Sequence, residues 1–316
     1  MRAITIPSFG PASVLTPASV ETPTPGPGQV AIDVGFAGVN FAEVLYRRGL
    51  VDVPLPFVPG IEVAGRVRAL GAGVTGPPVG TPVAALTVVD SGGYAGVAVT
   101  DARLVAPLGD VPPRTAAAVP SNSTTAFLAL DLVARLRPGE SVLVHAAAGG
   151  LGSQLGQVAR LLGAGRVVGT VGSAAKIDAA RAFGYPEVVL RDAVTGSFDV
   201  VVDMVGGPAR RLDLLAPLGR LVVLGNASDA LDVAVSANRL WLSSTAVLGF
   251  NLAAVSAHRP AEVGAALRRA VRAVAAGELR VDVEALPFDA AAEAHRRIEA
   301  GTTTGKLVLD LTPVRR

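Results

Sequence analysis

Residues 141–152 read Ser-Val-Leu-Val-His-Ala-Ala-Ala-Gly-Gly-Leu-Gly. Ser141–Ala146 is a short apolar run typical of a buried strand, and Leu151–Ala164 has the periodicity of a helix. Small residues between a strand and a helix let the backbone approach a pyrophosphate, which the unpaired N–H groups and positive dipole end of the helix attract. The stretch therefore predicts a dinucleotide-binding turn, and a tight turn without a ligand is the alternative.

The sequence on both sides of this turn indicates two domains. From Glu140 onward, expected strands and helices alternate, which indicates a parallel sheet with helices on both faces. Residues before 120 contain short apolar runs between Gly and Pro turn signals, which is typical of a compact β domain. The tail does not extend the alternation and is a candidate to return to the first domain. The expected elements after residue 120 are strands at Ser141–Ala146, Arg166–Val171, Glu187–Leu190, Asp199–Val205, Gly219–Gly225 and Ser243–Asn251, and helices at Ser123–Arg137, Leu151–Ala164, Ser173–Gly184 and Arg210–Leu215.

Composition excludes several kinds of site and partner. The chain of 316 residues has no cysteine, which excludes disulfides and thiolate-bound zinc. The three histidines are far apart and show no ligand-pair spacing, so no metal is expected. The net charge is +2 and no basic run contains interleaved aromatic residues, so nucleic acid is not an expected partner. No segment suits a signal peptide or a membrane span, so a cytoplasmic protein without a membrane partner is expected.

The residues after the second strand of the alternating domain indicate which dinucleotide binds. An NAD site usually has an Asp or Glu there, which accepts from the ribose 2′-OH. Here Gly-Ser-Ala-Ala-Lys at 172–176 contains no carboxylate. Ser173, Lys176 and Arg191 offer a hydroxyl and two cations, which suit the 2′-phosphate of NADPH. Lys176 is one of only two lysines, with Lys306, and a solvated position on a helix is the alternative for it.

Segments along nearly the whole chain resemble the zinc-independent, zeta-crystallin-like quinone oxidoreductases of the medium-chain dehydrogenase/reductase superfamily. The resemblance implies an α/β fold, with a GroES-like β-barrel domain at 1–120 and 254–316 and a Rossmann doubly wound parallel-sheet domain at 121–253. Ile61 stands where zinc-dependent relatives have a histidine, which is typical of the zinc-free branch. The matching segments are His145–Gly152, Gly169–Ser173 with Lys176, Gly38–Glu43, Pro59–Gly65, Gly92–Ala95, Leu224–Asn226 and Thr304–Leu309.

The same resemblance implies the positions of site residues and a partner. Asn40 is expected beside the nicotinamide, and a homodimer is expected through the Rossmann edge strand near Ala246–Phe250. The residues expected to bind NADPH are Asn40, Thr125, Ala148, Gly149, Gly150, Leu151, Gly152, Gly172, Ser173, Lys176, Arg191, Leu224, Gly225, Asn226, Phe250 and Leu252.

The reaction expected from these features is hydride transfer from NADPH to a quinone or an α,β-unsaturated carbonyl compound. Without zinc, hydrogen-bond donors must polarise the substrate carbonyl, and the candidate catalytic residues are Asn40 and Tyr46. A helix N-cap is the alternative for Asn40, and a surface ring is the alternative for Tyr46. Two other functions stay open: a pathway enoyl reductase of secondary metabolism, and an NADPH-binding protein with little turnover.

Other charged residues near the candidate site have structural interpretations. Glu43, Arg47 and Arg48 share one expected helix and are expected to form surface ion pairs. Glu62 lies in an expected strand of the β domain and should pair with a basic group there. His145 ends a buried strand and is expected to be structural.

Overall fold

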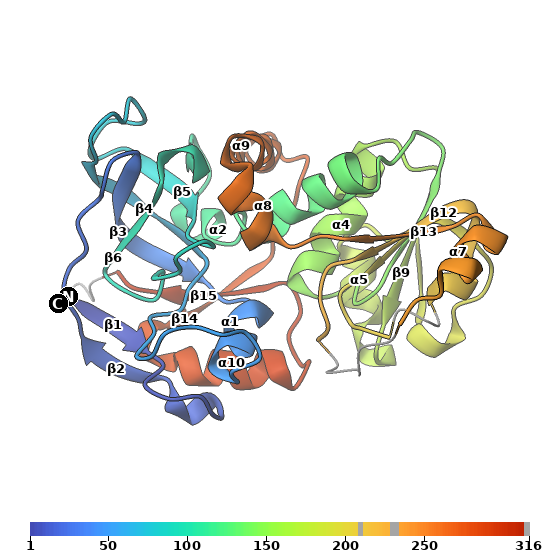
Figure 1. The fold of residues 1–316 in the computed structure, drawn as a ribbon, viewed down its shortest axis with the longest axis horizontal. Helices are drawn as coiled ribbons and strands as arrows, with labels where there is room; N and C mark the ends of the chain where they lie inside the picture. Colours follow the sequence, from blue (N-terminus) through green and yellow to red (C-terminus); the bar gives the residue numbers. More distant parts are fainter. Residues whose placement is uncertain (208–210, 228–233, 313–316) are drawn as a thin grey trace. The chain divides into compact units, whose positions relative to one another are not determined.

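The structure is a computed structural model that describes residues 1–207, 211–227 and 234–312. The chain forms two compact units, which can be followed by colour in Figure 1. One unit contains Met1–Thr124, Leu252–Gly277 and Val281–Arg316, and the other contains Thr125–Asn251 and Glu278–Arg280. We call them the barrel unit and the Rossmann unit.

The barrel unit is built on a seven-stranded sheet. Its strands are β3 (Gln29–Gly38), β4 (Glu62–Leu70), β5 (Pro82–Leu86), β6 (Val97–Asp101), β7 (Val105–Pro107), β14 (Val283–Pro287) and β15 (Lys306–Asp310). They pair in the order β14-β15-β3-β4-β5-β7, and β6 also pairs with β3. A separate antiparallel pair joins β1 (Arg2–Thr5) and β2 (Thr16–Ser19). β15 pairs with β3 in the antiparallel direction. A strand from the end of the described chain therefore lies beside a strand from its beginning.

Apolar side chains of these strands form the core of the barrel unit. Val30, Ala31, Ile32 and Val34 of β3 are buried, whereas Asp33 among them is exposed. The helices of the unit are α1 (Phe41–Arg47), α2 (Pro113–Ala116), α8 (Leu252–His258), α9 (Pro260–Ala275) and α10 (Ala291–Glu299). The short helix α1 packs against α10 and against a 3₁₀ turn at Ala12–Val14, so two sides of α1 are covered.

The Rossmann unit contains a six-stranded sheet in which every pairing is parallel. The spatial order of the strands is β10-β9-β8-β11-β12-β13. The first strand in the sequence, β8, lies near the centre, and later strands are added on both sides of it, which is the doubly wound order. The strands are β8 (Ser141–Val144), β9 (Arg166–Val171), β10 (Glu187–Leu190), β11 (Phe198–Asp203), β12 (Leu215–Val223) and β13 (Ala246–Gly249). The helices include α4 (Gly150–Leu161), α5 (Ile177–Ala182) and α7 (Ala237–Ser243), and α3 (Asn122–Phe127) leads into the unit.

Two elements of the Rossmann unit differ from the sequence prediction. The helix expected at Arg210–Leu215 is found only in part: Arg211 is helical and Leu212–Leu214 form a 3₁₀ turn, but β12 already begins at Leu215, and residue 210 lies outside the described residues. The sequence pattern also does not predict α7, because Trp241 and Leu242 are each 75% exposed and the helix has no buried apolar stripe.

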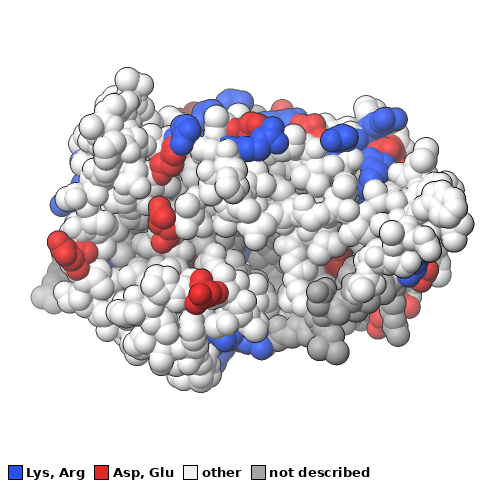
Figure 2. Space-filling view, in the orientation of Figure 1, with Lys and Arg blue, Asp and Glu red and all other residues white. Residues whose placement is uncertain are grey.

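Charged side chains are sparse and mixed in sign on the face that Figure 2 shows. Basic residues lie among acidic ones there, and uncharged residues cover most of that surface. Among the described helices, none has both the length and the apolar character that a membrane crossing requires. The cytoplasmic location stays a prediction.

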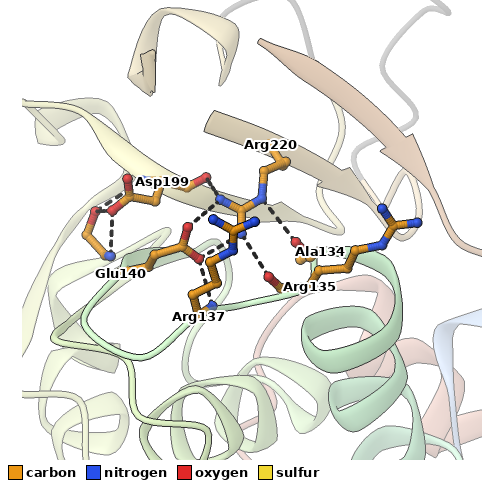
Figure 3. Close-up of polar contacts among 7 residues, drawn as sticks. Ala134, Arg135, Arg137, Glu140, Asp199 and Arg220 are labelled. Atoms are coloured by element: carbon orange, nitrogen blue, oxygen red, sulfur yellow. Dashed lines mark hydrogen bonds and ion pairs between the residues drawn. The ribbon is translucent and has the colours of Figure 1, made fainter. Parts of the chain in front are cut away.

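A network around Arg220 ties four segments of the Rossmann unit together (Figure 3). The guanidinium of Arg220, on β12, donates to both carboxylate oxygens of Glu140 over 2.9 and 2.7 Å. It also donates to three backbone carbonyls, those of Ala134, Arg135 and Asp199. These hydrogen bonds hold the pKa of Glu140 below its usual value. The guanidinium of Arg220, which is planar and has several N–H groups, therefore holds the segment before β8 against β11 and β12.

Replacing Arg220 with Met should lower the free energy of unfolding of the Rossmann unit by about 2–3 kcal/mol, because Glu140 and the carbonyls lose their donor. Urea unfolding followed by circular dichroism measures the change. The matched control is Arg181→Met, which removes an exposed ion pair with Asp178 and should cost no more than about 0.5 kcal/mol.

The difference between wild type and Arg220→Met should also depend on pH. A carboxyl group whose folded pKa is lowered stabilises the protein above its unfolded pKa, and this contribution is lost as the pH falls through the folded pKa. The stability gap should therefore be full at neutral pH and narrow in acid. Equal losses in the Arg220 and Arg181 variants would contradict the role assigned to the network.

Candidate functional site

The glycine-rich turn lies at the C-terminal edge of the parallel sheet. Gly149 is the N-cap of α4, and Gly150 is its first residue. A Cβ on Gly152 would lie 2.8 Å from the carbonyl carbon of Ala146, so this position needs glycine for the helix to pack this close to the strand end. The first turn of α4 presents backbone N–H groups that have no acceptor within the helix, which suits a phosphate. The turn holds five of the predicted cofactor residues: Ala148, Gly149, Gly150, Leu151 and Gly152.

The next three predicted polar residues lie at the ends of the neighbouring strands β9 and β10. Ser173 follows β9, Lys176 ends the 3₁₀ turn at Ala174–Lys176, and Arg191 directly follows β10. A terminal nitrogen of Arg191 would lie 3.5 Å from a Cβ at Gly172, so the guanidinium reaches across to the end of β9. Burial lowers the pKa of Lys176.

This set of groups fits a phosphate that is attached to the ribose. The Nε atom of Arg191 is buried and has no hydrogen-bond acceptor among the described residues. A hydroxyl and two cationic side chains follow the ends of neighbouring strands, and residues 172–176 contain no carboxylate that would repel an anion.

The remaining predicted cofactor residues lie in several places. Leu224, Gly225 and Asn226 follow β12, and the Leu224 N–H donates to the Asp203 carbonyl over 2.8 Å. Phe250 follows β13 and is buried. These four residues are therefore at the same edge of the sheet as the glycine turn, because all its strands are parallel. Thr125 is buried in α3, and Leu252 begins α8 and belongs to the barrel unit.

His145 directly follows β8, and its ring lies beside Thr170 of the neighbouring strand β9. Its ring is fully buried, and Nδ1 lies 2.8 Å from the Thr170 hydroxyl. Burial, with smaller contributions from Arg211 and Arg191, lowers the pKa of His145 to about 3. The ring is therefore neutral at physiological pH, in line with the structural role expected for it.

Asn40 in the barrel unit is the centre of a buried polar cluster. It is the N-cap of α1, and its side chain is enclosed on two sides by charged groups. The amide nitrogen Nδ2 donates to Glu62 Oε1 over 2.9 Å, and Lys306 Nζ donates to the amide oxygen Oδ1. Lys306 Nζ also lies 2.6 Å from Glu62 Oε1. Glu62 is completely buried, and Lys306 and Asn40 are 4% and 9% exposed.

Glu43 closes the cluster on the helix side. Its Oε2 accepts from the Asn40 backbone N–H over 2.7 Å, and its Oε1 accepts from the Ile61 N–H over 3.1 Å. Asn40 Nδ2 also points to Glu43 Oε1, at 3.5 Å. Burial raises the pKa of Glu43 to about 7, although Lys306 acts in the opposite direction. The cluster therefore contains a carboxyl group that titrates near neutral pH.

The expectations for the charged residues of α1 are partly wrong. Glu43 and Arg47 are buried, not surface residues, because α1 packs against α10 and the 3₁₀ turn at Ala12–Val14. Arg47 lies 2.5 Å from Glu299 of α10 and also donates to the Gly10 carbonyl. Arg48 alone of the three is exposed. The pairing expected for Glu62 is confirmed, with Lys306 as its partner.

Tyr46 lies on the same helix and is half-buried. Its ring meets Phe57 edge-on, with 5.7 Å between the centroids. Burial, with a smaller contribution from Glu43, raises the pKa of Tyr46 to about 12. The phenol therefore keeps its proton at neutral pH and can act as a hydrogen-bond donor.

Sequence reasoning did not assign Lys306 to the site. The available signal was its rarity, since the chain has only two lysines, and its place in a segment that matches the family. Spacing could not reveal the contact, because Lys306 and Asn40 are 266 residues apart. Within residues 1–207, 211–227 and 234–312, no group of three His, Asp or Glu side chains is arranged to hold a metal ion.

Comparison with known proteins identifies the family. Residues 26–110 match the alcohol dehydrogenase GroES-like domain, and residues 178–309 match a model described as zinc-binding dehydrogenase. A probable quinone oxidoreductase of Schizosaccharomyces pombe is 32% identical over 318 residues, which cover 95% of this chain and 94% of that protein. The chain belongs to the quinone oxidoreductase family. The resemblance and the fold class given by the sequence, a GroES-like domain with a Rossmann domain, are confirmed.

Two further proteins are similar to this chain. The Escherichia coli quinone oxidoreductase complexed with NADPH has a TM-score of 0.87 at 28% identity, and the match covers 98% of this chain and 100% of that chain. The spectinabilin polyketide synthase system protein NorB of Streptomyces orinoci is 37% identical over 317 residues, which are 95% of this chain and 14% of NorB.

Proposed function

We propose that this quinone oxidoreductase family member is an NADPH-dependent enzyme that reduces quinones or α,β-unsaturated carbonyl compounds by hydride transfer, without zinc. The observation that carries the proposal is the edge of the Rossmann sheet where Ser173, Lys176 and Arg191 follow strand ends and where residues 172–176 contain no carboxylate. The E. coli relative, whose structure contains NADPH, supports the same cofactor.

The proposed cofactor site uses the backbone turn for the pyrophosphate and the cations for the 2′-phosphate. Gly149–Gly152 would hold the pyrophosphate through the N–H groups of α4. Leu224–Asn226 and Phe250 would line the nicotinamide half, as the resemblance implies. When bound there, NADPH supplies a hydride from C4 of its nicotinamide to an electron-poor carbon.

Zinc-free polarisation of the substrate carbonyl is the second part of the proposal. The chain has no cysteine, and Ile61 stands where zinc-dependent relatives have a histidine. Hydrogen-bond donors must then stabilise charge that develops on the substrate oxygen. Tyr46 keeps its proton and can donate, and Asn40 contributes the polar end of a rigid cluster. The amide of Asn40 can donate to a substrate only if it gives up a hydrogen bond within that cluster.

A second candidate function is enoyl reduction within a secondary-metabolite pathway. The observation that favours it is the similarity to NorB, a polyketide synthase system protein, over 95% of this chain. Both functions use the same hydride transfer, and they differ in the acceptor, which is a thioester-linked enoyl group in the second case.

We also propose a homodimer that forms through β13. This strand is the last in the six-stranded sheet, and one of its edges has no partner in the described part of the chain. The N–H of Phe250 donates inward to Val223 of β12, so by alternation Val247 directs its backbone groups to the outer edge. Exposed Trp241 and Leu242 on α7, immediately before β13, add apolar surface near this edge.

Lys176→Ala and Arg191→Ala should each weaken NADPH binding by roughly tenfold to a hundredfold, because each removes one charge-assisted contact with the 2′-phosphate. NADH binding should change much less, so the NADPH preference shrinks. Calorimetric titration of both dinucleotides measures this. Arg181→Ala removes an exposed arginine of α5 and should leave the preference unchanged. A residue whose removal leaves the preference intact does not belong to the phosphate site.

Oxidation of NADPH should be fast with at least one class among small quinones, enals and enones, and slower with enoyl thioesters. Absorbance at the NADPH band measures each rate. Added EDTA should not lower these rates, because the proposed chemistry needs no metal. Turnover with enoyl thioesters alone would favour the pathway enoyl reductase. Tight NADPH binding without any turnover would favour a binding protein instead of an enzyme.

Val247→Pro should convert a dimer to a monomer in sedimentation analysis, because proline removes an outward-facing N–H while the inward ladder to β12 remains. Val247→Ala is the control, since it loses the same side-chain packing but keeps the N–H, and it should remain dimeric. A monomeric wild-type protein, or a dimeric proline variant, would exclude this interface.

A further inference from the structure

Three strands of the barrel unit meet at Asn40. β3 ends two residues before it, and the strands on both sides of β3 are β15, which begins with Lys306, and β4, which begins with Glu62. The pairing of β15 with β3 continues through a 2.9 Å hydrogen bond from the Val39 N–H to the Leu307 carbonyl, which places Lys306 opposite Asn40. The sheet therefore brings an ammonium and a carboxylate to the same amide.

Glu62 reaches Asn40 only because residue 38 is glycine. A Cβ on Gly38 would lie 2.5 Å from the carboxyl carbon of Glu62, which is far inside van der Waals contact. The other carboxylate oxygen of Glu62 accepts from the Ser121 N–H over 2.8 Å. Both oxygens of Glu62 are therefore fixed by donors, Oε1 by the side chains of Asn40 and Lys306 and Oε2 by a backbone N–H.

The charges around Asn40 allow only one orientation of its amide. The oxygen Oδ1 accepts from Lys306, and the nitrogen Nδ2 faces the carboxylates of Glu62 and Glu43. The two ends of a carboxamide have nearly the same shape, so packing alone does not distinguish them. If the amide turned over, its oxygen would face a carboxylate and its NH₂ group would face an ammonium. Charge therefore sets the orientation.

Stability alone does not explain this arrangement. Burying two charges is costly, and a buried ion pair can often be replaced by apolar side chains with no loss of stability. Here both charges are almost completely buried, and each also bonds to Asn40. An apolar pair at positions 62 and 306 could not distinguish the oxygen of the Asn40 amide from its nitrogen.

We propose that Lys306 is a positioning residue for hydride transfer, which acts by fixing the amide of Asn40, with Glu62 as its counter-ion. This inference rests on the proposed function, in which Asn40 lies at the reaction site. Lys306 sets the direction of the amide dipole and keeps Asn40 in one rotamer. The reactive geometry at Asn40 then needs no rearrangement during each turnover.

Lys306→Met should lower kcat by about tenfold to a hundredfold, because Oδ1 loses the ammonium that holds it and the amide of Asn40 is in its productive rotamer for only part of the time. The Kd for NADPH should change less than about twofold, because the phosphate-binding groups are in the other unit. In an Asn40→Ala background, Lys306→Met should have little further effect on kcat, since no amide is left to position. Independent effects that multiply, or an unchanged kcat in a folded Lys306→Met protein, would overturn the proposal.

A double variant separates positioning from stability. Lys306→Met leaves Glu62 as a buried charge without a counter-ion, so that variant is expected to be less stable. Lys306→Met with Glu62→Gln is neutral and should regain most of the thermal stability. Its kcat should stay low, because a Gln at position 62 can accept from or donate to Asn40 and so permits both amide orientations. Recovery of kcat together with stability would mean that Lys306 is only structural.

Arg220→Met is the control for loss of stability. It breaks an ion pair in the Rossmann unit and should unfold more easily, but it touches no residue placed at the site. Well below its unfolding temperature, its kcat should equal that of the wild type. A similar fall in kcat in this variant would attribute the Lys306 effect to stability.

The side-chain amide signal of Asn40 in a ¹⁵N NMR spectrum tests the positioning without turnover. The signal is assigned by its disappearance in Asn40→Ala. Its protons should exchange slowly in the wild type and at least about tenfold faster in Lys306→Met. Unchanged exchange would refute the inference even in an inactive protein. A wild-type protein that oxidises no NADPH but shows the expected exchange would instead refute the proposed function.

Discussion

The ion pair between Glu62 and Lys306 is the interaction on which the arrangement of the candidate site depends. It joins β4, from the first part of the chain, to β15, from its end, on the two sides of β3, which ends two residues before Asn40. Each of the two groups is nearly removed from water, so neither is tolerable without the other. The Rossmann unit is inserted in the sequence between these partners, and the barrel sheet closes only when the chain returns from it.

Glycine serves the same purpose in both units. At Gly38 the missing side chain leaves the space that the Glu62 carboxylate fills, and at Gly152 it lets the first turn of α4 approach the end of β8. One glycine admits a charged side chain from a neighbouring strand, and the other admits a backbone. In each case a larger residue would be acceptable to the local secondary structure but not to what packs against it.

The sequence predicted those parts of the molecule that local patterns determine. The turn at 147–152 could be recognised because strand, small residues and helix follow one another directly, and the cations at 176 and 191 are proposed for the phosphate because residues 172–176 contain no acid. The burial of Glu43 and Arg47 could not be seen in this way. The helix that carries them is covered by α10, about 250 residues later, and no pattern within α1 records that contact. The sequence predicted that Glu62 pairs with a basic residue. That this residue is Lys306 follows only from the pairing of β3 with β15.

The cluster at Asn40 thus combines local and distant information. Asn40 and Glu43 are related by the spacing of a helix start, which is visible in the sequence, whereas Lys306 is supplied by the topology. Because the two carboxylates come early in the chain and the ammonium comes late, burial of the cluster is unfavourable until the last strand is in place.

That late arrival of β15 has a consequence for biogenesis. A nascent chain on the ribosome exposes both carboxylates, and then the entire Rossmann unit, before residue 306 emerges. Throughout that interval, burial of the acidic groups of the incomplete barrel unit is unfavourable, because Lys306 is not yet present to pair with them. Closure of the barrel sheet is thereby the later event in synthesis, because Lys306 emerges after the last residue of the Rossmann unit.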